Sequence, residues 1–262
     1  NSYYSRLCQR LISALSVQTG QGQLYEVDVQ LRPMGASGSL ACDFARLEKY
    51  YQTEAWIWEL MALSRARVIV APSKLQVEIE QLIKNTLCTS RDAGELASHV
   101  YGMRRKIEAE RGTEDPWHIK YVRGGLVDLE FLVQYLQLRD AAIESGILST
   151  HTIGALERIA AVGSLSFRSV DELTVAAHLF LNLQAIMRIS LSGQFEEKKS
   201  PNGLRDVLVR ASGADDFPDL KAKLINAQGV VSGYFAAIIR EAASAYELTI
   251  QPEKKVNKWQ KN

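Results

Sequence analysis

The sequence has few cysteines, and their spacing excludes two common ways of stabilising a small domain. Cys8, Cys42 and Cys88 are odd in number, widely separated and without a Cys-x-x-Cys pair. This pattern argues against both a disulfide framework and a zinc site. The four histidines show no spacing typical of metal ligands either. We therefore expect a protein of a reducing compartment, the cytoplasm.

The chain also lacks long apolar runs and a surplus of charge. The longest apolar stretches, such as residues 68–72 and 179–183, fall far short of the roughly 20 residues that a membrane-spanning helix needs. Basic and acidic residues number 31 and 30 and are interspersed, so no long-range field marks a binder of nucleic acid or membrane. We expect a soluble chain that has neither of these as a partner and that binds any anion locally.

The first residues, Asn-Ser-Tyr-Tyr, contain no initiator methionine, no basic segment and no continuous apolar segment. They resemble neither a signal peptide nor a natural start, and we expect the chain to be a fragment. With 262 residues, of which 47% are hydrophobic, it is still long enough to bury a sizeable core.

Two short elements of different kinds are predicted near the amino terminus. Leucines at helical spacing predict a helix over residues 3–15. Strict alternation then predicts a strand over residues 25–31, which Pro33 stops. Because a lone strand needs a sheet, either a local hairpin exists or the rest of the sheet lay upstream.

Beyond residue 43 the apolar residues recur at helical spacing almost to the end. Asp43 and Ser73 are the predicted caps of two helices, and Trp56 and Trp58 are expected in the core. Later helices are expected around residues 96–107, from Gly125 to about Arg139, and over residues 151–161, 169–191, 203–211 and 217–246. The fold class is therefore mainly α, an array of helical bundles.

The polar face of the predicted strand carries Glu26, Asp28 and Arg32. From the alternation alone this is a solvated sheet face. The functional alternative is that a carboxylate completes a metal site for phosphoryl chemistry while the arginine binds phosphate. Arg65 and Arg67 leave a similar choice, between phosphate binding and a structural pair with Glu54 or Glu59.

A second place for chemistry is Gly124-Gly125, just before the most apolar helix. Two glycines that open a helix expose free backbone N–H groups at its positive end, which suits phosphate, and Lys120 lies close by. The alternative is a tight turn with a solvated lysine. On the helix itself Glu130, with Gln134 and Gln137, forms a polar stripe that predicts a hydrogen-bond network or the wall of a cleft.

Three sequence blocks resemble the signature of bacterial glutamine synthetase adenylyltransferases. They are Tyr-Glu-Val-Asp-x-x-Leu-Arg-Pro-x-Gly-x-x-Gly-x-Leu from Tyr25, Glu-Ala-Trp-x-Trp-Glu-x-x-Ala-Leu-x-Arg-Ala-Arg-Val from Glu54, and Lys-x-x-x-Gly-Gly-x-x-Asp-x-Glu-Phe-x-x-Gln-Tyr from Lys120. The second and third blocks are more similar to the carboxyl-terminal, adenylylating half of that two-headed enzyme than to its deadenylylating half. The helices after residue 140 are similar to a helical region also found in PII uridylyltransferases.

The resemblance implies a nucleotidyltransferase domain of the DNA-polymerase-β type, of which a small β remnant would remain at the amino terminus. In that family two Mg²⁺ ions are held by a Gly-Ser-x-Asp-x-Asp pair and by a third carboxylate, whose position Asp28 occupies. Asp28 is thus the implied metal ligand and catalytic residue. Substrate or phosphate contacts are implied for Arg32, Arg65, Arg67, Lys120, Gly124, Gly125, Asp128 and Glu130.

The sequence also departs from that family. No Gly-Ser-x-Asp-x-Asp follows a strand, and the nearest imitation, Gly213-Ala-Asp215-Asp216, predicts a helix cap. Gln30 stands where the family usually has arginine, and Leu60 where the adenylylating half often has histidine. We expect the fragment to be inactive by itself.

The implied organisation is a nucleotidyltransferase remnant over 1–42, a helical region over 43–140 that contributes to the active-site cleft, a bundle over 141–250 and a frayed tail over 251–262. The implied parent is a multifunctional enzyme of nitrogen metabolism that moves AMP from ATP to a tyrosine of glutamine synthetase and, in its paired half, removes it by phosphorolysis. PII is the implied regulator, and glutamine is a candidate effector. The alternatives are a helical partner-binding module without activity and a PII uridylyltransferase.

Overall fold

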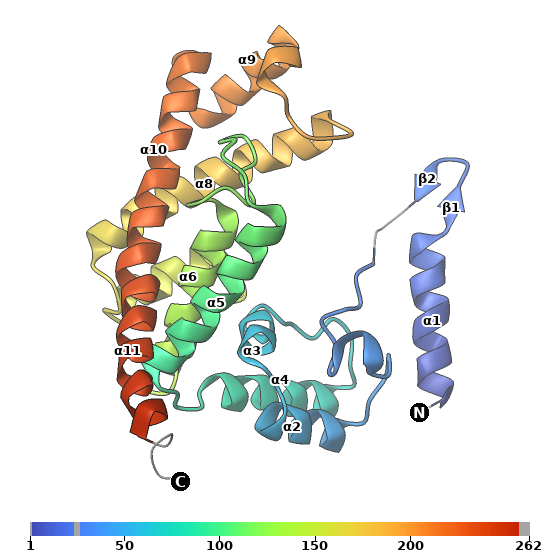
Figure 1. Ribbon diagram of the computed structural model, residues 1–262. Coiled ribbons are helices and arrows are strands. Elements are labelled where there is room, and N and C mark those ends of the chain that lie inside the picture. Colours follow the sequence, from blue (N-terminus) through green and yellow to red (C-terminus); the bar gives the residue numbers. More distant parts are fainter. Residues whose placement is uncertain (1, 24–26, 257–262) are drawn as a thin grey trace. The chain divides into compact units, whose positions relative to one another are not determined.

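The computed structural model describes residues 2–23 and 27–256, with side chains described as far as residue 249. It is mainly helical, and it divides into two compact units, an amino-terminal unit of residues 1–86 and a carboxyl-terminal unit of residues 87–262 (Figure 1). The prediction of a mainly α fold is confirmed. The fourfold division over 1–42, 43–140, 141–250 and 251–262 stays a prediction.

The amino-terminal unit begins with a helix and a very small hairpin. Helix α1 (Ser2–Ser16) confirms the predicted helix, although none of its side chains is buried. Strand β1 (Gln18–Thr19) pairs antiparallel with β2 (Gly22–Gln23). The hydroxyl of Thr19 donates to the carbonyl of Gly22 at 2.6 Å and thereby closes the turn. A local hairpin therefore exists, but it lies before the predicted strand.

The strand predicted over residues 25–31 is wrong in its described part, because residues 27–29 are irregular and residues 30–31 form a turn. The carboxylate of Asp28 accepts the N–H of Gln30 at 2.8 Å, which favours a turn. The guanidinium of Arg32 donates to the carbonyls of Val29 and, at 3.0 Å, of Gly38. Backbone groups that a ladder would need are thus taken up locally. Residues 24–26 lie outside the described residues.

After the 3₁₀ turn η1 (Gly35–Ser37), the unit has three helices: α2 (Phe44–Thr53), α3 (Ile57–Leu63) and α4 (Ser73–Leu87). Asp43 caps α2 as predicted, accepting the N–H of Arg46 at 2.9 Å. The buried carboxylate of Glu59 accepts from the hydroxyl of Tyr50 at 2.6 Å and from the N–H of Trp56 at 2.8 Å. This bond holds Trp56 at the start of α3, outside the core.

The expectation that both tryptophans belong to the core is wrong. Trp56 is 67% exposed and Trp58 is 38% exposed. The chain leaves the helix between α2 and α3, so the apolar residues between Asp43 and Ser73 are divided between two short helices. The buried face of α3 is formed instead by Leu60, Met61 and Leu63.

The carboxyl-terminal unit is a bundle built around α6 (Leu126–Asp140). Its leucines at 129, 132, 136 and 138 have no exposed surface. Helix α6 contacts α5 (Ala93–Arg111), α7 (Thr152–Ala161), α8 (Phe167–Ser190) and α10 (Phe217–Phe235). The 3₁₀ turn η2 (Ser145–Ile147) precedes α7, and η3 (Glu197–Lys199) precedes α9 (Asn202–Ser212). These helices confirm the predicted ones to within a few residues.

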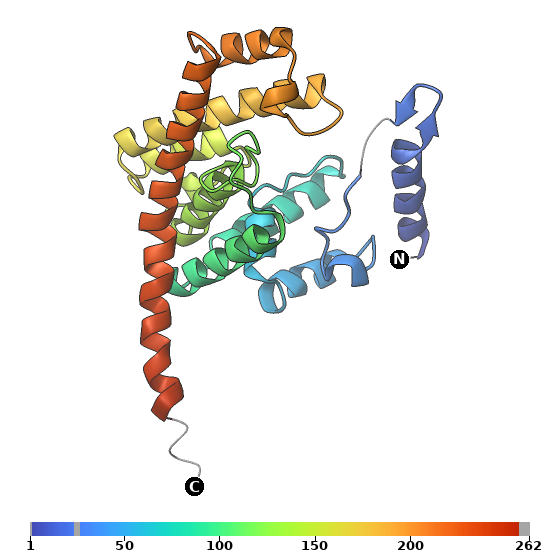
Figure 2. The ribbon, with the colours of Figure 1, turned by 45° about the horizontal axis from the view of Figure 1, so that its top comes forward.

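The last helices join end to end. Helix α10 continues through a π-helical stretch, η4 (Ala236–Arg240), into α11 (Glu241–Val256), and together they form one long rod along the bundle (Figures 1 and 2). Asp216 caps α10 by accepting the N–H of Asp219 at 2.8 Å, which confirms the cap predicted there. Helix α11 packs on α5 so closely that a Cβ at Gly94 would lie 2.9 Å from that of Tyr246.

Two segments of the described chain, Phe167–Ser190 and Phe217–Thr249, are long and apolar enough to cross a membrane by length and composition alone. Core helices pass the same test. The buried side chains of α8 include Leu173, Phe180 and Leu183, and the helix packs against α7, α9 and α10. In the second segment the buried side chains include Leu220, Leu224 and Val231 of α10.

Phe180 should report on this core. It has no exposed surface, so Phe180→Ala is expected to lower the free energy of unfolding by about 3–5 kcal/mol. Phe167, 77% exposed on the same helix, is the matched control, and Phe167→Ala should cost less than about 0.5 kcal/mol. Urea unfolding followed by circular dichroism measures both. Equal losses would contradict the placement of α8.

Candidate functional site

The residues predicted for chemistry belong to both units. Asp28, Arg32, Arg65 and Arg67 lie in the amino-terminal unit, and the residues from Lys120 to Glu130 lie in the carboxyl-terminal unit. Each group is described by itself.

In the amino-terminal unit, Asp28 and Arg32 share one loop. Asp28 is exposed, and one of its carboxylate oxygens accepts the N–H of Gln30. Arg32 is half-buried and donates to the carbonyls of Val29, Ala36 and Gly38. The arginine thus organises the loop that presents the carboxylate. Arg65 and Arg67 are exposed in the segment that follows α3.

The described residues do not build a complete metal site. Within residues 2–23 and 27–256, no group of three or more His, Cys, Asp or Glu side chains could hold a metal ion. Mg²⁺ prefers several oxygen ligands in an octahedron, and the carboxylate of Asp28 supplies one of these at most in a monodentate contact. This part of the chain therefore does not fit a bound Mg²⁺ without further ligands.

In the carboxyl-terminal unit, Asp128 and Arg104 form a buried ion pair. They are 2% and 3% exposed, and the guanidinium nitrogens Nε and Nη2 of Arg104 both donate to the carboxylate. Nη2 also donates to the carbonyl of Tyr121 at 3.2 Å, and the N–H of Gly124 donates to the second oxygen of Asp128. The pair therefore ties α5, α6 and the loop between them together. With both oxygens engaged in the interior, the carboxylate is a structural group here.

The free amides predicted at Gly124-Gly125 are not free. The N–H of Gly124 is bonded to Asp128, and that of Gly125 to the carbonyl of Val122 at 2.9 Å. The next amide, of Leu126, donates to the carbonyl of Ile119 at 2.8 Å. The prediction of an anion site at these amides is wrong, and the alternative of a tight loop-to-helix turn is the one observed.

The glycines serve a close approach of backbones instead. Gly124 has a φ of +76°, and a Cβ there would lie 1.9 Å from the carbonyl oxygen of Gln228 on α10. A Cβ at Gly125 would lie 2.2 Å from the carbonyl oxygen of Ile119. The side-chain amide of Gln228 in turn donates to the carbonyl of Pro116 at 2.8 Å. Loop 116–125 is therefore pressed against α10.

The polar stripe on α6 has at least one structural partner. The side-chain oxygen of Gln137, 2% exposed, accepts the N–H of Ser149 at 2.7 Å. Glu130 lies in the second turn of the helix and is half-buried. The hydrogen-bond network therefore accounts for Gln137, and a cleft-facing role for Glu130 stays a prediction.

Lys120 is exposed and lies beside Tyr121, with its ammonium nitrogen 5.1 Å from the centre of the ring. Arg111 donates to the phenolic oxygen at 2.7 Å. Burial alone would raise the pKa of Tyr121, but the hydrogen bonds from Arg111 and Lys120 outweigh it and lower that pKa below its usual value. The phenol oxygen thus sits in a locally positive environment.

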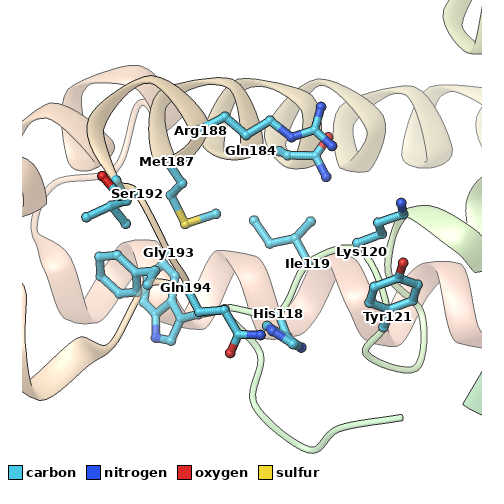
Figure 3. Close-up of a pocket in the computed structure, with 13 residues that line it drawn as sticks. His118, Ile119, Lys120, Tyr121, Gln184, Met187, Arg188, Ser192, Gly193 and Gln194 are labelled. Atoms are coloured by element: carbon cyan, nitrogen blue, oxygen red, sulfur yellow. The ribbon is translucent and has the colours of Figure 1, made fainter. Parts of the chain in front are cut away.

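Lys120 and Tyr121 also line a pocket of about 290 Å³ between their loop, α8 and the segment after α8 (Figure 3). Arg188 and Gln184 of α8 line it from the other side. One signal for this unit was overlooked in the sequence: Arg104 follows Val100 by four residues on the buried face of α5, where an arginine needs a partner. Nothing in the spacing of the sequence joined Arg188 to Lys120.

Comparison with known proteins gives two family matches. A model described as glutamate-ammonia ligase adenylyltransferase matches residues 1–82, and a model described as GlnD PII-uridylyltransferase matches residues 101–197. Curated relatives named bifunctional glutamine synthetase adenylyltransferase/adenylyl-removing enzyme are similar over nearly the whole chain. The one from Rhodopseudomonas palustris (strain BisB5) is 41% identical over 237 residues, 90% of this chain. Over this length the chain is similar to members of that adenylyltransferase family.

Two further relatives carry the same name. Those from Bradyrhizobium diazoefficiens and Agrobacterium fabrum are 38% and 37% identical over 93% and 91% of the chain. In each of the three cases the adenylyltransferase family member is much longer, and the chain spans 24% of its length. The resemblance drawn from the three sequence blocks is thus confirmed. The match over residues 101–197 agrees with the similarity to PII uridylyltransferases expected for the later helices.

The role of Gly124 can be separated from the cost of its backbone conformation. Gly163 has nearly the same φ, +77°, but nothing lies within 4 Å of a Cβ built there. Gly163→Ala should therefore cost about 1 kcal/mol of unfolding free energy for the left-handed conformation alone. Gly124→Ala adds a clash with backbone and should cost at least about 3 kcal/mol. Equal effects in thermal unfolding would show that loop and α10 are not in close contact.

The ion pair predicts a second stability effect. Asp128→Asn removes the charge that compensates the buried guanidinium of Arg104, and the free energy of unfolding should fall by about 3–5 kcal/mol. Asp171→Asn, at an exposed position of α8, is the control and should change it by less than about 0.5 kcal/mol. A stable Asp128→Asn protein would argue that the carboxylate is kept for ligand binding.

Proposed function

We propose that this chain is part of an enzyme that transfers AMP from ATP to a tyrosine hydroxyl of glutamine synthetase and so regulates nitrogen assimilation. The observation that carries the proposal is the identity of 37–41% over at least 90% of the chain with relatives named for that activity. The same name supports a paired activity that removes the AMP, for which we propose phosphorolysis. The cytoplasm is the proposed location.

Asp28 is the proposed catalytic residue and metal ligand. It is the only carboxylate described in the loop of residues 27–42, it is exposed, and one hydrogen bond from Gln30 fixes its orientation. The remaining ligands would come from outside the described residues, in a nucleotidyltransferase domain of the polymerase-β type. When bound, two Mg²⁺ ions would stabilise the charge of the transferred phosphoryl group. Transfer by the isolated chain is not expected, because these ligands are missing from its described part.

The basic residues are proposed to hold phosphates or acidic parts of the substrates. The guanidinium of Arg32 has five N–H donors. It makes three carbonyl bonds in the loop, so it can keep the loop and still contact one phosphate. Lys120, Arg65 and Arg67 are exposed and therefore accessible to a ligand. Gly124, Gly125 and Asp128 contribute indirectly, by fixing the backbone that carries Lys120. Glu130 is proposed to face the substrate from α6.

A second candidate function is a helical module that binds a regulator and has no chemistry of its own. The match of residues 101–197 to a PII-uridylyltransferase model favours it for the carboxyl-terminal unit. PII is the proposed regulator, and glutamine is a proposed effector. The two functions are compatible if the amino-terminal unit contributes to catalysis while the bundle senses the regulator. A complete PII uridylyltransferase is the less favoured alternative, since the relatives are named adenylyltransferases.

Asp28→Asn in the complete enzyme tests the catalytic proposal. Loss of the charge should lower the rate of AMP transfer to glutamine synthetase at least about a thousandfold. The melting temperature should stay level, since Asp28 is exposed and asparagine can accept the same N–H. Glu48→Gln, at an exposed position of α2, is the control and should leave transfer unchanged. Near-normal turnover of Asp28→Asn, or strong transfer by the isolated 262-residue chain, would refute the assignment.

A further inference from the structure

The pocket in the carboxyl-terminal unit has two ends of different chemistry. Figure 3 shows Lys120, Tyr121, Gln184 and Arg188 gathered at one end, with Lys120 and Tyr121 coming from the loop and the other two from α8. Met187 points into the pocket further along α8. The buried rings of Trp117 and Phe195, whose centres are 4.8 Å apart, also line the pocket. A polar, cationic part is thus joined to an apolar part.

The charge of the lining is of one sign. Lys120 and Arg188 are the cations among the lining residues, and no Asp or Glu is among them. The nearby carboxylate of Glu197 is engaged elsewhere: it accepts from Lys221 at 2.7 Å and from the indole N–H of Trp117 at 3.0 Å. The hydrogen bonds from Lys221 and Trp117 lower the pKa of Glu197, which keeps it ionised and bound to them. The positive charge of the pocket therefore remains available for an anion.

Two further polar groups of the pocket can bind a ligand. The ring nitrogen Nδ1 of His118, a lining residue, is buried and has no hydrogen-bond partner within the described protein. The hydroxyl of Tyr121 accepts from Arg111, so its own proton can be donated to a ligand. A tetrahedral anion with several acceptor oxygens matches donors that converge from α8 and from the loop.

We propose that this pocket binds a phosphate monoester with a small apolar or aromatic organic part. Lys120, Arg188 and Gln184 would hold the phosphate, and Met187 with the neighbouring apolar lining would contact the organic part. A volume of about 290 Å³ suits a ligand of that size and lies at the lower limit, about 300 Å³, of typical small-molecule sites. The proposal rests on the proposed function only in the role of Lys120, and it is tested by binding alone.

Isothermal titration of the 262-residue chain with phenyl phosphate, AMP and inorganic phosphate tests the proposal. At least one of the two organic phosphates should bind at least about tenfold more tightly than inorganic phosphate. Arg188→Gln and Lys120→Gln should each weaken its binding about tenfold, because each removes a charge-assisted hydrogen bond. Met187→Ala should weaken the binding of the organic phosphate and leave the binding of inorganic phosphate unchanged. Arg210→Gln, at an exposed position of α9 outside the pocket, is the control and should change nothing.

Circular dichroism verifies that each variant is folded, and a glutamine variant that is not is replaced by the alanine exchange at the same position, which also removes the charge. Two results would overturn the proposal: organic phosphates that bind no better than inorganic phosphate, or binding that is the same in Arg188→Gln and in the unmodified chain. Neither result bears on Asp28, whose role is measured by AMP transfer in the complete enzyme. The two proposals therefore fail separately.

Discussion

The buried ion pair between Arg104 and Asp128 is the interaction on which the carboxyl-terminal unit depends. An arginine inside a helical bundle is tolerated only if a nearby opposite charge compensates its own. Asp128 supplies the charge, and its second oxygen captures the N–H of Gly124. One side chain thus couples the orientation of two helices to the path of the loop between them. Lys120 and Tyr121 owe their position beside α8 to that loop.

Much of this fold follows from the sequence, because the signals of a helix lie in residues that are close together along the chain. The apolar spacing of α6 and the caps at Asp43 and Asp216 were readable from neighbouring residues, and the structure agrees. The same holds for the resemblance to the adenylyltransferases, which rests on runs of residues. Asp28 was likewise singled out by its place in such a run, and its proposed role as a metal ligand needs further ligands that the described residues do not provide.

What the sequence could not provide are contacts between distant residues. The alternation at residues 25–31 has the period of a strand. In the described part, however, hydrogen bonds made by Asp28 and Arg32 within the loop favour a turn over strand pairing. Two glycines before a helix fit an anion site and a tight turn equally well. The carboxylate of Asp128, which pairs with Arg104 of α5 and accepts the N–H of Gly124, decides for the turn. The pocket has the same origin, since tertiary packing alone brings Lys120 and Arg188 into the lining of one pocket.

The π-helical stretch between α10 and α11 has a consequence for insertions and deletions. One extra residue per turn rotates everything beyond it by about 100° relative to an unbroken α-helix. The face of α11 that meets α5 at Gly94 and Tyr246 is therefore set by the length of η4. Relatives that lack one residue there would have to carry their α5-facing side chains one position earlier or later. The length of η4 thus sets which side chains of α11 face α5, relative to those of α10 that face the bundle. A change in that length would require the apolar residues of α11 to shift by one position along the sequence.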